Sequence, residues 1–163
     1  MNTIKKEKGF TIIEVVLVLA IAGLIFLMVF IALPSLQKSQ RDGQRRTDVA
    51  RVVTKVTDYS NNNRGGIPTS LITQSGSPSR SFVQRYLGGT NATTSGTEYL
   101  DPVTGTGYVF LTPGTSPTQV GQVGYAPGSI CGTDGAFTSG SARQYALAIF
   151  LESSSAPYCV DSR

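Results

Sequence analysis

The chain has 163 residues, a formal net charge of +4, and neither histidine nor tryptophan. Without histidine it lacks the side chain that most often serves as a general base or metal ligand, which argues against an enzyme. No lysine follows Lys55 to activate the many serines, and no phosphate-binding glycine motif is present. We therefore predict no catalytic residue, no cofactor and no metal site.

The first long element is an apolar run. From Val15 to Leu33 no residue carries a charge or a polar side chain. As a helix this run would be about 28 Å long, close to the hydrocarbon thickness of a bilayer. A cleaved secretory signal has a shorter apolar core and a small-residue cleavage site after it. The run therefore predicts a membrane helix, and a simple anchor is the plainest interpretation.

Glu14 stands at the start of this run, where a simple anchor does not explain it. An acidic side chain inside a membrane costs about 2.5–3.5 kcal/mol on insertion scales, so a partner is expected. Cleavage between Gly9 and Phe10 would create an α-amino group near the start of the run. Between two staggered helices, the amine of one copy would meet the Glu14 carboxylate of its neighbour.

The segment KGFTIIE, followed by the apolar run, resembles the signature of type IV prepilins and pseudopilins: Gly9, Phe10, Thr11 and Glu14 match it. The resemblance implies a leader over residues 1–9, which a prepilin peptidase removes before methylating Phe10. It implies that an assembly ATPase and a platform protein extract subunits into a homopolymeric filament. The apolar helices would form its core, and Glu14 would neutralise the amine of a neighbouring subunit.

Two residues are expected to weaken the apolar half of the helix, residues 10–34. Gly23 lies where the family often has a helix-loosening glycine, and Pro34 lacks an N–H and is expected to kink or break the helix. By resemblance, residues 24–33 would unwind on assembly. The family commonly places its first helix proline about three residues earlier.

The location of the chain is predicted from the motif and the cysteines, because basic residues flank the apolar run on both sides. The leader would be cytoplasmic and the remaining domain external, first at the cytoplasmic membrane and then in an extracellular filament. Cys131 and Cys159 are expected to form one disulfide that clips the C-terminal tail to the sheet edge. Two free buried thiols are the alternative.

Residues 35–62 are predicted to continue the helix as an amphipathic half. One face carries Val49, Val52, Val53, Val56 and Tyr59, and the polar run 61–66 is the stop signal. The basic stretch 41–51 suggests nucleic acid, but no aromatic residue interleaves with it. A solvated helix face, or salt bridges between subunits, is favoured instead.

Residues 63–97 are predicted to form a connecting region with one short helix, capped by Ser77 or Ser79 and stopped by Gly88. Residues 98–163 are predicted to form an antiparallel sheet closed by the disulfide. The predicted strands are Glu98–Leu100, Gly107–Thr112, Val120–Ala126 and Gln144–Glu152. Asp101 and Asp134, near glycines, hint at calcium, but turn capping is favoured.

The expected fold is therefore α+β: a long N-terminal helix packed on a small antiparallel sheet, as in pilins. The expected function is that of a structural filament subunit in precursor form. A pseudopilin or minor pilin of a secretion or DNA-uptake system is the first alternative. A membrane-anchored surface domain that never polymerises is the second.

Overall fold

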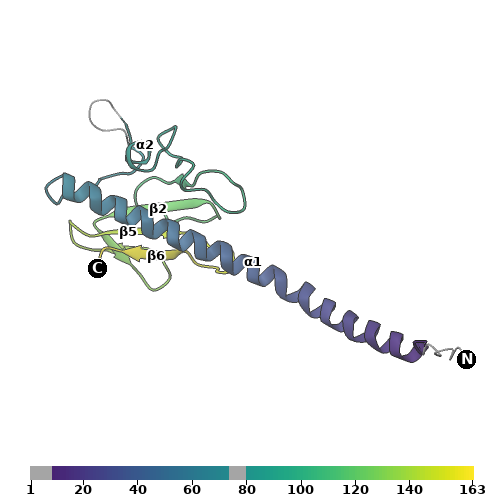
Figure 1. Ribbon diagram of the computed structural model, residues 1–163. Coiled ribbons are helices and arrows are strands. Elements are labelled where there is room, and N and C mark those ends of the chain that lie inside the picture. Colours follow the sequence, from purple (N-terminus) through teal and green to yellow (C-terminus); the bar gives the residue numbers. More distant parts are fainter. Residues whose placement is uncertain (1–8, 74–79) are drawn as a thin grey trace, which may run out of the picture. The chain divides into compact units, whose positions relative to one another are not determined.

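A computed structural model describes residues 9–73 and 80–163 of the chain (Figure 1). The chain divides into two compact units, residues 1–37 and residues 38–163. Of the predicted leader, only Gly9 lies within the described residues. Helix α1 (Ile12–Asn62) contributes to both units.

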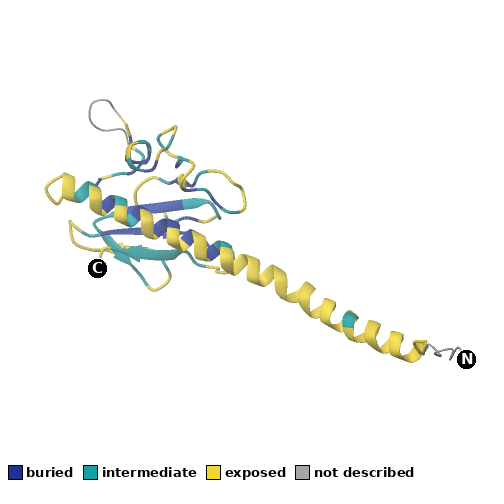
Figure 2. Cartoon of the chain, viewed as in Figure 1, coloured by how far each residue is buried: buried dark blue, intermediate teal, exposed yellow. Residues whose placement is uncertain are grey.

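In the first unit, helix α1 begins at Ile12, and every residue of 9–37 except Ala22 is exposed (Figure 2). Pro34 lies inside α1, which continues on both sides of it, so the helix does not break there; the alternative expectation of a kink at Pro34 stays a prediction. Gly23 is also helical, as are residues 24–33 between the two. Their unwinding on assembly stays a prediction.

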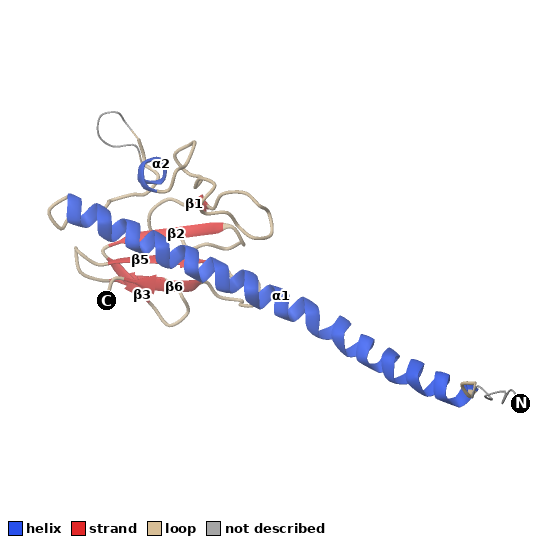
Figure 3. Cartoon of the chain, in the orientation of Figure 1, coloured by secondary structure: helices blue, strands red, loops and turns tan. Residues whose placement is uncertain are grey.

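In the second unit, the C-terminal part of α1 crosses one face of the main sheet (Figure 3). Val49, Val52 and Val56 are buried, and Val53 and Tyr59 are partly buried against the same core. The predicted apolar face is confirmed. Each buried valine contributes about 1.5–3 kcal/mol by leaving water.

The main sheet has four strands in the order β1-β2-β5-β6. They are β1 (Val109–Phe110), β2 (Gln122–Pro127), β5 (Tyr145–Ile149) and β6 (Tyr158–Asp161). Every residue of β5 is buried, which confirms the strand predicted from its continuous apolar run. β5 pairs antiparallel with both β2 and β6, and its register places Tyr125 opposite Leu147.

The sheet is mixed rather than purely antiparallel as predicted, because β1 pairs parallel with β2. The intervening residues 111–121 include Pro113 and Pro117, which have no N–H to donate to a strand ladder. This segment therefore leaves the sheet and returns instead of forming a tight hairpin. A second sheet pairs β3 (Ser129–Cys131) with β4 (Phe137–Ser139); these strands and β6 were not predicted.

Two other predictions are corrected in the connecting region and after it. The short helix α2 (Phe82–Tyr86) is capped by Ser81, whose side chain accepts from the backbone N–H of Gln84. Ser77 and Ser79, the predicted caps, lie outside the described residues. Gly88 follows the helix with φ of 65°, as its predicted stop role requires. Glu98–Leu100 is not a strand: it contributes one isolated bridge, Leu100 to Gly107.

Candidate processing and assembly site

The start of α1 is organised by a hydrogen-bonded box between Thr11 and Glu14. The Thr11 backbone N–H and hydroxyl both donate to Oε2 of Glu14, at 2.9 Å and 2.7 Å. The Glu14 N–H donates weakly in return to Thr11 Oγ1, at 3.4 Å. This is a capping box: it satisfies two donors that a helix start otherwise leaves unpaired. The prediction from sequence gave Glu14 only an amine partner, although the Thr-x-x-Glu spacing itself signals the box.

Gly9 and Phe10 precede the helix and are exposed, with the Phe10 side chain 90% exposed. Their peptide bond lies outside the helical hydrogen-bond ladder, so a protease does not have to unwind α1 to reach it. Phe10 and Glu14 line the same shallow groove, together with Val15, Val18 and Leu19. An amine generated at Phe10 would therefore start on the helix face that carries Glu14.

Glu14 is the one charged residue between Gly9 and Gln37. The surrounding side chains are apolar and exposed, from Ile12 at 86% to Leu33 at 44%. Within the described residues, α1 is the one helix long and apolar enough to cross a membrane. Such a surface is stable only in lipid or against other apolar helices. In lipid the lone carboxylate is costly, whereas an opposite charge beside it would offset that cost.

The basic stretch 41–51 is the second candidate site, and the structure corrects its interpretation as a solvated face at Asp42 and Arg45, whereas Arg46 and Arg51 are exposed. Arg45 is fully buried: it donates to Asp42 at 2.9 Å, to Asp101 at 2.7 Å and to Glu152 at 2.6 Å. Arg41 adds a two-point bond to the Glu152 carboxylate, at 2.9 Å and 2.6 Å. We call these five residues the Arg45 cluster. It ties α1 to the loop after β5 and to the turn at Asp101.

The carboxylates of the Arg45 cluster are held in their charged form. Hydrogen bonds from Arg41 and Arg45 lower the pKa of Glu152 from its ordinary value of 4.5 to about 2. Burial would raise the pKa of Asp42, but bonds from the Ser153 hydroxyl, two backbone N–H groups and Arg45 outweigh it and lower that pKa. These charges are therefore engaged within the chain and are not offered to a nucleic acid.

Asp48, next along the same helix, differs from these groups. Burial raises the pKa of Asp48, although the Tyr108 hydroxyl donates to its carboxylate at 2.9 Å and Arg51 lies nearby.

The exposed arginines of the basic stretch lie on aromatic rings: Arg46 is 5.1 Å from the ring centre of Tyr158. Arg51 lies 4.6 Å from that of Tyr99. Because the two arginines already lie against these rings, Tyr158 and Tyr99 are not free aromatic surfaces on which bases could stack.

Asp101 caps a turn, as favoured over a calcium site. Its Oδ1 accepts from the N–H groups of Val103 and Thr104, at 2.9 Å and 3.2 Å, and its Oδ2 from Arg45. Burial opposes the charge, but these bonds outweigh it and lower the pKa of Asp101. In residues 9–73 and 80–163, no group of three or more His, Cys, Asp or Glu is placed to hold a metal ion.

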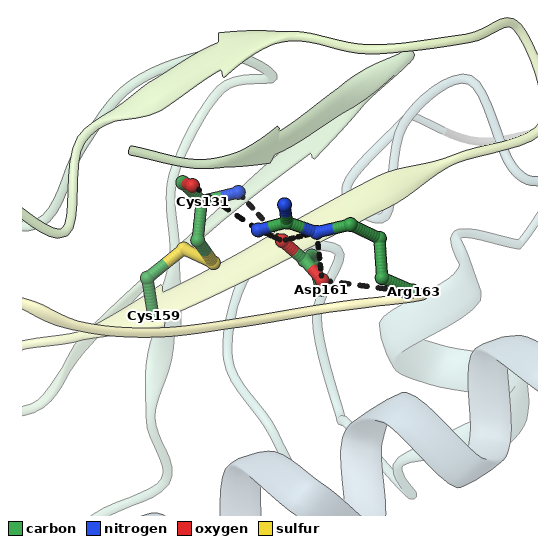
Figure 4. Close-up of a disulfide and its surroundings, with 4 residues drawn as sticks. All are labelled: Cys131, Cys159, Asp161 and Arg163. Atoms are coloured by element: carbon green, nitrogen blue, oxygen red, sulfur yellow. Dashed lines mark hydrogen bonds and ion pairs between the residues drawn. A yellow bond between two sulfur atoms is a disulfide. The ribbon is translucent and has the colours of Figure 1, made fainter. Parts of the chain in front are cut away.

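Cys131 and Cys159 form a disulfide, which confirms the predicted pairing over two free thiols (Figure 4). The bond joins β3 to β6, the edge strand of the main sheet. Beside it, Asp161 accepts from the N–H of Cys131 at 2.8 Å and from Arg163. The C-terminal strand is thus attached to β3 both covalently and by a hydrogen bond from the Cys131 N–H to Asp161.

Comparison with known proteins agrees with the geometry at the start of α1. A family model described as the prokaryotic N-terminal methylation motif matches residues 4–30. No curated protein and no solved structure matches the chain. The matched segment contains Gly9, Phe10, the capping box and most of the exposed apolar helix. The chain therefore carries the class III signal peptide of type IV pilins, followed by a pilin-like α+β fold.

Proposed function

We propose that the chain is the precursor of a structural subunit of a type IV pilus-like filament. A prepilin peptidase cuts after Gly9, the new amine of Phe10 is methylated, and subunits leave the membrane to polymerise through their apolar helices. An assembly ATPase and a platform protein drive this step. The mature filament is extracellular.

The observation that supports this proposal most strongly is the position of one carboxylate. Glu14 lies four residues after Phe10, on the groove shared with it, within a helical segment up to Gln37 that carries no other charge. Its Oε2 is occupied by Thr11, and Oε1 accepts no hydrogen bond within the described residues. Oε1 is the atom through which a neighbouring copy's amine would bind without first breaking the capping box.

The test is the substitution Glu14→Gln, which keeps the size of the side chain and removes the charge. We expect the variant to stay in the membrane fraction and to form few or no filaments. Glu98→Gln is the matched control, because the Glu98 side chain is 76% exposed and lies outside the apolar helix. Normal filament yield from Glu14→Gln would contradict the proposal and favour a non-polymerising anchored domain.

The amount of filament separates a major subunit from a pseudopilin or minor pilin, since all of them carry the same N-terminal chemistry. Long filaments sheared from the surface and composed chiefly of this chain would support the major subunit. Traces of the chain in filaments made of another protein would support a minor role in secretion or DNA uptake.

A further inference from the structure

The second unit contains a cavity of about 320 Å³ that the filament function does not use. Its walls come from three segments: the end of α1, the loop 68–73, and residues 80–86 around helix α2. This volume is at the small end of the range for ligand pockets, so it suits one or two rings rather than an extended chain.

One wall is aromatic. Tyr59, Phe82 and Tyr86 contact one another, with Phe82 and Tyr86 stacked at 4.7 Å between ring centres and Tyr59 edge-on to both. Phe82 is only 5% exposed, whereas the two tyrosines are partly exposed. Within the described residues, no hydrogen bond reaches either tyrosine hydroxyl. Phe82 and Tyr86 cover one face of each other, while the partly exposed Tyr59 and Tyr86 contribute ring surface and two hydroxyl groups to the lining.

The charge that the described residues bring to the lining is positive. Arg80 and Arg85 line the cavity and are exposed, and none of the described lining residues is an aspartate or glutamate. Neither arginine forms an ion pair within the part of the chain that the structure describes. A guanidinium group binds a carboxylate through two parallel N–H donors, which gives both affinity and orientation.

The remaining lining is rich in small polar groups. Asn63 lines the cavity and donates through Nδ2 to the Tyr59 carbonyl, and its amide oxygen accepts no hydrogen bond within the described residues. Hydroxyls of Thr69, Ser70 and Thr73 complete this side. Such groups match the hydroxyls of a sugar, and partly exposed tyrosines match its C–H face.

We propose that this cavity binds an acidic sugar residue, with its carboxylate on Arg80 and Arg85. Its ring would lie against Tyr59 and Tyr86, and its hydroxyls would bond to Asn63 and the threonines. A nucleic acid fits less well. Binding of a single strand needs an extended basic groove that follows the backbone, and here the two arginines line one compact cavity.

The test is binding of free sugars to the full chain in detergent micelles, measured by ligand-observed NMR titration. The probes are N-acetylneuraminic acid and glucuronic acid, with glucose as the neutral match to the latter. Inorganic phosphate and a short single-stranded oligonucleotide are the competing anions. Arg80→Gln and Arg85→Gln remove one charge each, and Arg143→Gln is the control, an exposed arginine that does not line the cavity.

We expect the acidic sugars to bind and glucose to bind much more weakly. Each cavity substitution should weaken binding about tenfold, since each removes a charge-assisted hydrogen bond. The control should change affinity less than twofold. The proposal is overturned by equal binding of glucose, by unchanged affinity in both cavity variants, or by phosphate or oligonucleotide binding more tightly than the sugars. None of these outcomes depends on cleavage at Gly9 or on Glu14, so a failure here leaves the filament proposal standing.

Discussion

Replacing Arg45 by methionine should strongly destabilise the second unit. Methionine keeps most of the side-chain length but removes every hydrogen bond to Asp42, Asp101 and Glu152. Breaking one partner of a buried ion pair costs about 3–5 kcal/mol, because the remaining charge stays buried. Asp42 and Asp101 keep backbone donors, and Glu152 keeps Arg41, so we expect the lower end of that range.

The assay is thermal unfolding of the full chain in micelles, followed by circular dichroism. A loss of about 3 kcal/mol should lower the melting temperature by roughly 10 °C for a unit of this size. Arg46→Met is the matched control: it removes an exposed cation–π contact worth about 0.5–1 kcal/mol. A loss below about 1 kcal/mol for Arg45→Met, or equal losses for both variants, would refute the buried-cluster argument.

Three further predictions concern the same fold. First, stability should fall between pH 4.5 and about 2, because Glu152 has a lowered pKa in the folded chain; the pairing energy is present above pH 4.5 and lost as the carboxylate protonates. Asp48, whose pKa is raised by burial, opposes this loss, so an acid titration that shows greater stability at pH 2 than at pH 6 would contradict us. Second, reducing the disulfide should cost roughly 3–4 kcal/mol, and the double variant Cys131→Ser/Cys159→Ser should melt at the temperature of the reduced chain whether or not reductant is present. Third, Thr11→Val should weaken the start of α1 by about 1 kcal/mol, seen as faster amide exchange at residues 12–15, while Thr11→Ser keeps the hydroxyl and should exchange as the original chain does.

Local patterns in the sequence were sufficient for part of this fold. The 3.6-residue spacing of Val49, Val52 and Val56 predicted the buried helix face, and the continuous apolar run predicted the central strand β5. The signal-peptide motif was evident because its chemistry lies within six residues, from Gly9 to Glu14. In each case the information is contained in one short segment.

The missed features depend on distant partners. Arg45 resembles any exposed cation in a polar helix, and two of the three carboxylates that make its burial tolerable, Asp101 and Glu152, lie 56 and 107 positions away. Strand β6 is four residues long and pairs with β5 across a loop, so no periodicity of its own marks it. The cavity near α2 likewise combines three segments whose residues are unremarkable in sequence.

Mass spectrometry of the N-terminus of native, surface-sheared material tests the central claim most directly. Our account predicts a mature chain that begins at Phe10 with a methylated amine and lacks residues 1–9. A chain that retains residues 1–9 in assembled filaments, or one whose new N-terminus lies elsewhere, would contradict it.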